Sequence, residues 1–173
     1  MKKFRKILLG LTSVALSLSL AGCSASKDGT ARTANDGNEK KVEESAIKLV
    51  NATQKGKYKL INVEDVKKAV DNKEDVLLVN TMPAENFAAT KIANSVNAGL
   101  PVSMDKLKPE EKENFLKVLG DNKDKKIIIY CGFVACGRSD VGATLAVEAG
   151  YKNVYRFPGG IAAWLDNGGS VAK

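Results

Sequence analysis

Short apolar runs alternate with amphipathic segments along most of the chain. Continuous runs bounded by polar residues are typical of buried strands in a parallel sheet. They occur at Val76–Val79 and Ile127–Tyr130; Val154–Phe157 is predicted as a third strand, and Tyr58–Ile61 is a short strand candidate. Because the strands alternate with helical segments, the pattern predicts an α/β domain with a small, mainly parallel sheet flanked by helices.

Apolar residues at helical spacing predict where the helices lie. We expect them at Val42–Gln54, in the segment after Asn62, and at Leu107–Leu119, Asp140–Ala149 and Ile161–Leu165. Asn62 is a good N-cap, Pro109 stands near the start of its helix, and Gly120 follows the end. Pro158-Gly159-Gly160 predicts a turn before the last helix.

The first residues have the pattern of an export signal. Basic residues come first, at Lys2, Lys3, Arg5 and Lys6. The apolar stretch Ile7–Leu20 is short and dotted with Ser and Thr, which is poor for a spanning helix. Leu20-Ala21-Gly22-Cys23 resembles the lipobox of bacterial lipoproteins. The resemblance implies cleavage before Cys23 and acylation of its thiol; an uncleaved anchor and an ordinary secretory peptide are the alternatives.

These features divide the chain into four parts. Residues 1–22 are expected to be the lipoprotein signal peptide, and residues 23–41 the lipidated N-terminus and a flexible tether without large apolar residues. Residues 42–57 form a leading helix, and residues 58–173 form the folded domain. Two or three acyl chains anchor a protein stably. The expected location is therefore the cell membrane, lipid-anchored on the extracytoplasmic face.

The charge of the chain falls once the signal peptide is set aside. The whole sequence has a net charge of +7. Four of its 27 basic residues precede residue 23, so the remainder has 23 basic against 20 acidic residues, a net charge of +3. There is no Lys/Arg cluster with interleaved aromatic residues. We therefore expect no nucleic-acid partner.

Cysteine and histidine usage restricts the chemistry. The sequence has three cysteines and no histidine. A Ser-His-Asp triad, a Cys-His dyad and a His-ligated metal are thereby excluded, and we expect no metal and no cofactor. If Cys23 is lipidated, Cys131 and Cys136 remain. They are either a disulfide pair or one reactive thiol with a neighbour.

Cys131 stands where the most apolar strand of the chain ends. Ligands of α/β sheets bind beyond the carboxyl ends of such strands. Cys131 is therefore the candidate catalytic residue, and the substrate-binding loop that follows comprises Gly132, Phe133, Val134, Ala135, Cys136, Gly137 and Arg138. Glycines permit converging N–H groups, and a helix N-terminus follows. Both favour anionic sulfur, which predicts a depressed pKa for Cys131.

At this point the sequence resembles the rhodanese-like domains, the single-domain sulfurtransferases, over about residues 58 to 172. The blocks that carry the resemblance are Val76–Val79, Ile127–Cys131, Arg138-Ser139, Gly150–Val154 and Pro158–Trp164. The resemblance implies a three-layer fold and transfer of sulfane sulfur through a Cys131 persulfide, held by the loop N–H groups. The implied partners are a small sulfur-containing donor and a thiol or anionic acceptor.

The sequence departs from the family pattern at three places. Asn80-Thr81-Met82 replaces the frequent Asp-x-Arg, and Thr90–Ser95 replaces a Gly-His-Ile-Pro-Gly-Ala stretch, with Lys91 in place of His. The active loop has six residues between Cys131 and Arg138 instead of the common four. Its second cysteine, Cys136, resembles a subgroup of rhodanese-like proteins.

Other functions remain open from the sequence. Cys131 and Cys136 suit a thiol–disulfide redox protein, although four intervening residues do not match the usual redox motif. The departures from the family pattern suit a non-catalytic binding module. Rhodanese-like phosphatases use a Cys-x5-Arg loop, which this loop does not match.

Several neighbouring residues have two interpretations each. Cys131 could be a small buried apolar residue, and Cys136 a packing residue or a disulfide partner. Arg138 is either solvated at the helix start or a clamp for an anionic substrate. Lys91 either attracts anionic donors or is surface charge. Trp164 favours the core, and Ser139 favours helix capping.

Overall fold

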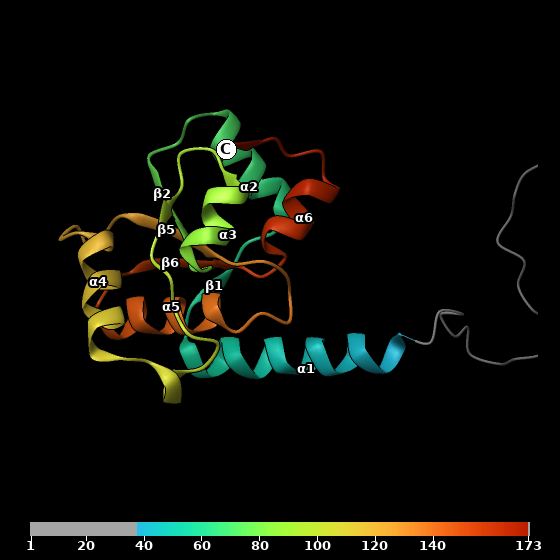
Figure 1. Ribbon diagram of the computed structural model, residues 1–173, viewed down its shortest axis with the longest axis horizontal. Coiled ribbons are helices and arrows are strands. Elements are labelled where there is room, and N and C mark those ends of the chain that lie inside the picture. The colour runs from blue at the N-terminus through green and yellow to red at the C-terminus, as the bar shows by residue number, and fades with distance from the viewer. Residues whose placement is uncertain (1–37, 173) are drawn as a thin grey trace, which may run out of the picture. The chain divides into compact units, whose positions relative to one another are not determined.

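A parallel five-stranded sheet lies at the centre of the domain, as the computed structural model in Figure 1 shows. The structure describes residues 38–172. The predictions for the signal peptide, for Cys23 and for the tether up to residue 37 concern residues outside this range. The strand order is β1 (Lys59–Leu60), β6 (Asn153–Phe157), β5 (Lys126–Tyr130), β2 (Val76–Asn80) and β4 (Val96–Asn97). A separate antiparallel pair joins β3 (Lys91–Ile92) to β7 (Val171–Ala172).

The strand register confirms the predicted pairing of the two most apolar runs. Strands β2 and β5 run parallel, with Leu78 opposite Ile128. Along β5, side chains alternate between the two faces of the sheet, as strand geometry requires. Ile127 and Ile129 contribute to one apolar cluster, and Ile128 and Tyr130 to the other. Both clusters are buried, which is why the run is continuously apolar.

Helices cover the sheet and complete the α/β architecture. They are α1 (Glu39–Gly56), α2 (Val63–Asp71), α3 (Ala84–Ala89), α4 (Pro109–Leu119), α5 (Arg138–Glu148) and α6 (Gly160–Asp166), with a 3-10 turn at Met104–Lys106. Helices α4 and α5 pack in one cluster, around Phe115 and Val141, and α2 and α6 in the other, around Val66 and Trp164. The predicted fold, a mainly parallel sheet flanked by helices, is confirmed.

Local signals explain most helix ends. The Asn62 side chain accepts a hydrogen bond of 2.8 Å from the Asp65 N–H, as its N-cap role requires. Gly120 ends α4 with a φ of +70°. The helix expected at Val42–Gln54 spans Glu39–Gly56, so it includes the last residues that we assigned to the tether. Helix α3, β3, β4 and β7 are short, and the periodicity analysis did not predict them.

Helix α1 lies alongside α5 and leads into β1 (Figure 1). Gly56 is buried at its end, next to Tyr58 and Thr144. Its other apolar residues include the exposed Val42, Ile47 and Val50. Across residues 38–172, no helix combines the length and the apolar character that crossing a bilayer requires.

Candidate active site

Cys131 follows the last residue of β5, at the carboxyl edge of the sheet. Strand β5 is central, because it pairs with β2 on one side and β6 on the other. The Cys131 residue is 0% exposed. Its predicted position at the carboxyl end of a buried strand is therefore correct, and reagents in solvent do not reach it directly.

The Pro158-Gly159-Gly160 turn brings the start of α6 against Cys131. The Ile161 N–H donates to the Cys131 carbonyl at 3.0 Å. A Cβ atom on Gly160 would lie 2.2 Å from the same carbonyl oxygen, and Gly160 has a φ of +57°. Only glycine meets both conditions without strain. The turn therefore fixes the base of the active loop.

The loop that follows Cys131 curls over the strand end and exposes its tip. Phe133 is 57% exposed and Val134 42%. The Cys136 N–H donates to the Phe133 carbonyl at 3.0 Å and closes the turn. Gly137 then packs so closely on Val102 that a Cβ would lie 2.1 Å from its carbonyl oxygen. The loop is thus held at its base and open at its tip.

Two carbonyl oxygens and the Ser139 hydroxyl surround the Cys131 sulfur. Its Sγ lies 3.5 Å from the Cys136 carbonyl and 4.0 Å from the Phe133 carbonyl, and the Ser139 hydroxyl is at 3.3 Å. Its hydrogen bond to the Cys136 thiolate, followed by burial, raises the pKa of Cys131. The expectation of a depressed pKa for Cys131 was therefore wrong. We had expected the N–H groups of the loop to face Cys131, whereas those of Gly132 and Arg138 stabilise Cys136.

Donors instead surround Cys136, the second thiol of the loop. A hydrogen bond from Cys131 lowers the pKa of Cys136 to about 5, with further contributions from the N–H groups of Arg138 and Gly132 and from the Arg138 side chain. Burial opposes this shift and is outweighed. Both cysteines are free. The contacts of this pair therefore favour a negative charge on Cys136 over one on Cys131.

Arg156, in β6, is a buried cation directly beneath the loop. It is 3% exposed. Its Nε donates to the Ser139 hydroxyl at 3.0 Å, and its terminal nitrogens donate to the Cys136 carbonyl and the Tyr58 hydroxyl at 3.1 Å each. Its ion pair with Asp140 is long, at 3.9 Å. A positive charge so weakly neutralised favours anionic sulfur nearby.

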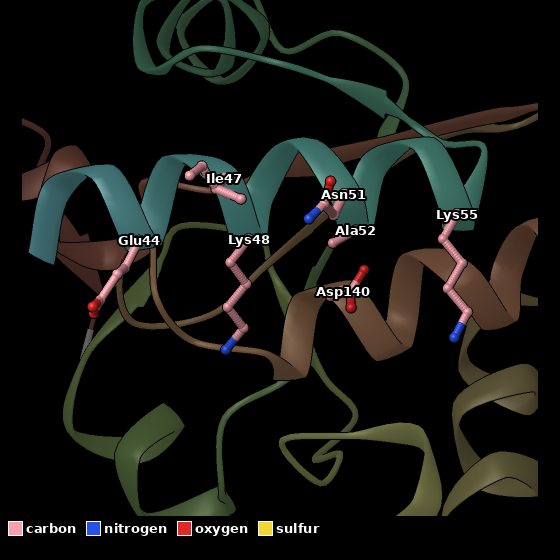
Figure 2. A pocket seen from close by; sticks show the side chains of 7 residues that line it. All are labelled: Glu44, Ile47, Lys48, Asn51, Ala52, Lys55 and Asp140. Carbon is pink, nitrogen blue, oxygen red and sulfur yellow. The ribbon is translucent and has the colours of Figure 1, made fainter. Parts of the chain in front are cut away.

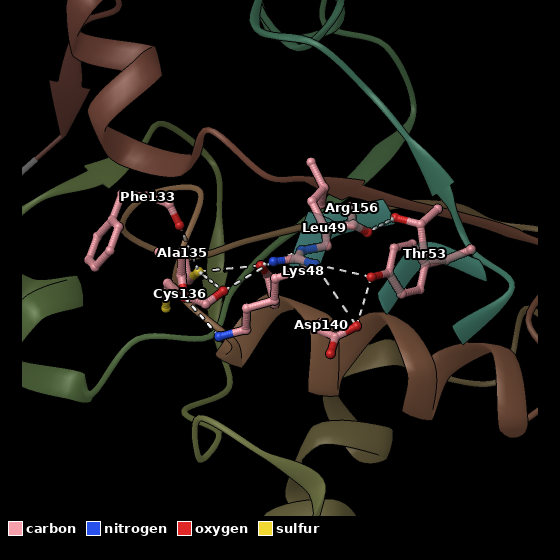
Figure 3. A network of polar contacts seen from close by, with 11 residues as sticks. Lys48, Leu49, Thr53, Phe133, Ala135, Cys136, Asp140 and Arg156 are labelled. Atoms are coloured by element: carbon pink, nitrogen blue, oxygen red, sulfur yellow. Dashed lines mark hydrogen bonds and ion pairs between the residues drawn. The ribbon is translucent and has the colours of Figure 1, made fainter. Parts of the chain in front are cut away.

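Tyr58 and Asp140 complete the network that holds Arg156. The Tyr58 hydroxyl donates to the Asp140 carboxylate at 2.7 Å. Burial, and then this hydrogen bond, raise the pKa of Tyr58, so it stays a neutral donor. Lys48, on α1, donates to the Ala135 carbonyl at 3.4 Å. Figure 3 shows Lys48 and Arg156 approaching the loop.

A groove of about 540 Å³ lies between α1 and α5, next to this network. Its lining residues are Glu44, Ile47, Lys48, Asn51, Ala52, Lys55 and Asp140. Figure 2 shows the side chains of Lys48 and Lys55 on α1, facing the same groove as Asp140. The groove adjoins the loop through Lys48 but neither cysteine lines it, so it is not the place where the sulfur reacts.

Arg138 is placed where a substrate clamp would be. It opens α5 and lines a hollow of about 310 Å³ together with Pro101 and Glu111. Its Nε atom is buried and has no hydrogen-bond partner. Neither cysteine lines this hollow, so Arg138 is linked to the loop only through its side chain, which stabilises a negative charge on Cys136; its unsatisfied buried donor could bind an anionic oxygen.

The other residues that the sequence singled out are Ser139, Trp164 and Lys91, and their contacts show where each of them lies. Ser139 is buried in the network and does not cap α5 with its side chain. Trp164 is a core residue whose Nε1 donates to the Ser170 carbonyl at 2.8 Å. Lys91 lies over the Phe87 ring at 5.2 Å. Within residues 38–172, no group of three or more Cys, Asp and Glu side chains is arranged to hold a metal ion.

The sequence analysis missed Arg156, Tyr58 and Asp140 as parts of the site. Each had been assigned to a strand or a helix on periodicity alone. A charged residue inside the apolar run of β6 was the available signal, because an arginine in a buried strand requires partners.

Known proteins resemble the chain in its fold. A sequence model of the rhodanese-like domain matches residues 62–167. The polysulfide-sulfur transferase homodimer of Wolinella succinogenes has a TM-score of 0.56 and 16% identity, over 78% of this chain and 91% of that one. Thiosulfate sulfurtransferase from Pseudomonas aeruginosa has a TM-score of 0.57 and 14% identity, over 76% and 23% respectively.

A protein from Bacillus halodurans is similar as well, with a TM-score of 0.53 and 20% identity over 73% of this chain and 85% of that one. No curated protein matches the sequence. At these identities the structural likeness shows the fold, whereas the domain match covers more than half of the chain. Together with the cysteine at the end of the central strand, it shows that this chain belongs to the rhodanese-like domain family.

Proposed function

We propose that the protein is a sulfurtransferase or sulfur carrier that moves sulfane sulfur through a persulfide on Cys131. The observation that carries the proposal is the loop itself, in which two free thiols lie above the buried Arg156 cation. The general sulfur-transfer role of the family agrees with it. The donor is a small sulfur compound, and the acceptor is a thiol or another anionic nucleophile.

The chemistry needs a thiolate and a place for anionic groups. A thiolate attacks the outer sulfur of a donor such as thiosulfate, an S–S bond forms, and sulfite leaves with the electrons of the broken bond. An acceptor nucleophile later takes the sulfur and restores the thiolate. Arg138 would bind the oxygens of the leaving group, and Arg156 would favour the anionic sulfur. No cofactor is required.

Mass spectrometry of the reduced protein tests this function. The protein is mixed with thiosulfate, polysulfide or cysteine persulfide, and the cysteine peptides are examined for a gain of one sulfur atom. The expected result is a persulfide on Cys131 with at least one donor, lost on addition of cyanide or a thiol. Absence of a persulfide with all three donors contradicts the proposal.

A thiol–disulfide redox function is the second candidate. The observation that favours it is the presence of two free thiols in one loop, each of which shifts the pKa of the other. It would make Cys136, the thiolate, the attacking group on an external disulfide. Exchange with a peptide disulfide at a rate that exceeds sulfur loading would favour this function over sulfur transfer.

The proposal includes a lipid anchor on the extracytoplasmic face of the cell membrane. It rests on the basic first residues, on the short apolar stretch and on Leu20-Ala21-Gly22-Cys23. Cys23→Ala is expected to leave an unprocessed precursor without attached lipid. If the variant fractionates and migrates like the parent protein, the anchor at Cys23 is refuted.

A further inference from the structure

The two cysteines differ in how far they lie from solvent and in what surrounds them. We propose that Cys136 is the thiol that takes sulfur from the external donor, and that it then passes the sulfur inward to Cys131. This relay rests on the proposed sulfur-transfer function and assigns the order of its steps.

The first argument is access. Cys131 is 0% exposed, whereas Cys136 is 9% exposed. Cys136 also follows directly on the exposed loop tip of Phe133 and Val134. A donor that approaches from solvent therefore meets Cys136 first, and it meets Cys131 only after the loop has moved.

The second argument is the polarity of the contacts. The N–H groups of Gly132 and Arg138, the Arg138 side chain and the Cys131 thiol all stabilise a negative charge on Cys136, whose pKa falls to about 5. Carbonyl oxygens face the Cys131 sulfur and favour its protonated form. Because the thiolate is the nucleophile of sulfur exchange, Cys136 is prepared to attack and Cys131 is not.

The third argument is the buried donor beside Cys136. The Arg138 Nε has no partner; neither cysteine lines the hollow that Arg138 shares with Pro101 and Glu111, but the Arg138 side chain is among the groups that lower the pKa of Cys136. A donor such as thiosulfate has an anionic group next to the sulfur that is attacked. Arg138 would hold that group while Cys136 forms the new bond, so the clamp and the attacking sulfur are neighbours.

The first step balances without an oxidant. The Cys136 thiolate attacks the outer sulfur of thiosulfate, a new S–S bond forms, and the old S–S bond breaks with its electron pair on the departing sulfite. Cys136 then has a persulfide anion. The sulfane sulfur keeps its oxidation state throughout.

The second step moves the sulfur inward. The Cys131 thiol first gives its proton to the outer sulfur of the Cys136 persulfide anion. The Cys131 thiolate then attacks that outer sulfur, and the bond between it and Cys136 breaks with its electron pair on Cys136, which leaves as the thiolate while Cys131 carries the protonated persulfide. A thiol of low pKa is the better leaving group, so the same contacts that activate Cys136 also favour its departure. The persulfide on Cys131 is then shielded from water by the loop.

Short-time loading experiments on the whole protein test the relay. Reduced parent protein, Cys131→Ser and Cys136→Ser are mixed with thiosulfate at pH 7, quenched with an alkylating reagent and examined peptide by peptide. Cys131→Ser is expected to accumulate a persulfide on Cys136. Cys136→Ser is expected to load Cys131 at least about tenfold more slowly than the parent, because the thiolate is lost. In the parent, sulfur should occupy Cys136 before Cys131.

Controls separate the relay from general effects of serine substitution. Leu165→Ser changes an exposed apolar residue of α6, at 47% exposure, and should load like the parent. Circular dichroism and thermal melting check the fold of each variant, and the order of labelling in the parent needs no substitution. In the parent, where the Cys131 thiol is present, the rate at which Cys136 loads should fall as the pH drops below about 5 and Cys136 becomes protonated.

Two results have different consequences. If Cys136→Ser loads Cys131 at the parent rate, or if the parent loads Cys131 first, the relay is overturned and the sulfur-transfer function stands. If the parent and both variants acquire no persulfide with thiosulfate, polysulfide or cysteine persulfide, the relay and the proposed function fail together.

Discussion

The loops that follow β2 and β5 leave the same edge of the sheet, yet they are held in different ways. After β2, polar groups are tied to one another: Thr81 Oγ1 donates to the Tyr130 carbonyl at 3.1 Å, and the Met82 N–H donates to the Asn80 side chain at 2.8 Å. After β5, the Cys131 sulfur faces the Ser139 hydroxyl, and Arg156 donates to that hydroxyl and to the Cys136 carbonyl. The first loop is scaffold, and the second holds the reactive groups.

The difference explains how this chain tolerates a departure from its family at β2. Asn97 donates its side-chain amide to the Asn80 and Met82 carbonyls, so β4 secures the loop that an Asp-x-Arg pair would otherwise occupy. The Nδ2 atom of Asn80 itself has no partner. None of these groups is hydrogen-bonded to the Cys131 sulfur, whose partners are Phe133, Cys136 and Ser139. The β2 loop therefore supports the fold and not the sulfur chemistry.

Ile128→Asp should have the largest effect, because it destroys the sheet that both loops share. Ile128 is 0% exposed and lies opposite Leu78. An unpaired buried carboxylate costs several kcal/mol or more, so the protein should not fold cooperatively. Thermal melting followed by circular dichroism measures this. A soluble variant with a parent-like transition would contradict the strand assignment.

Gly160→Ala should disturb the β5 loop alone, and Gly168→Ala is its matched control. Both glycines have positive φ, which costs a side chain about 1–2 kcal/mol. Only at Gly160 would the new Cβ also meet the Cys131 carbonyl, at 2.2 Å, while Gly168 has nothing within 4 Å. Gly160→Ala should therefore lose more stability and most of the sulfur loading. Equal melting temperatures and loading rates for the two variants would show that the close approach is unimportant.

Arg156→Met should weaken the chemistry more than the fold. It removes the donors to Ser139, Tyr58 and the Cys136 carbonyl, and we expect sulfur loading to fall about tenfold, or about 1.4 kcal/mol. Without this cation, the pH profile of Cys136 alkylation should shift upward.

Two further variants sharpen the Arg156 test. Arg156→Lys keeps the charge without the planar fork and should recover part of the rate. Lys59→Met removes an exposed cation from the neighbouring strand β1 and controls for net charge. If Arg156→Met alkylates and loads like Lys59→Met, Arg156 has a structural role only.

Thr81→Val should have the smallest effect and should leave the chemistry intact. The hydrogen bond from Thr81 Oγ1 is lost, at a cost of about 1 kcal/mol. The Tyr130 carbonyl keeps its bond from the Thr81 N–H, at 3.0 Å, so no acceptor is left unsatisfied. Denaturant unfolding measures the loss of stability, and sulfur loading should match the parent. A marked loss of loading would show that the β2 loop takes part in the reaction.

The sequence by itself determined the two central strands of the sheet and the position of the loop that follows β5. The apolar runs of β2 and β5 have a local cause, burial of a strand on both faces, and a local cause is visible in the order of residues. The same run also predicted the position of Cys131, which is the first residue after the end of β5. Helix ends were also visible for local reasons, at Asn62 before α2, at Gly120 after α4 and at the Pro158-Gly159-Gly160 turn before α6.

Only the tertiary structure decided which sulfur is the anion. Arg156 and Tyr58 are 98 positions apart, and Ser139 and Arg156 are 17 apart, so their convergence under the loop has no local signal. The pKa values of Cys131 and Cys136 depend on which atom donates to which sulfur, and this direction is set by the fold of the loop. Hydrogen bonds are directional and act over a few ångströms, whereas sequence periodicity records only burial.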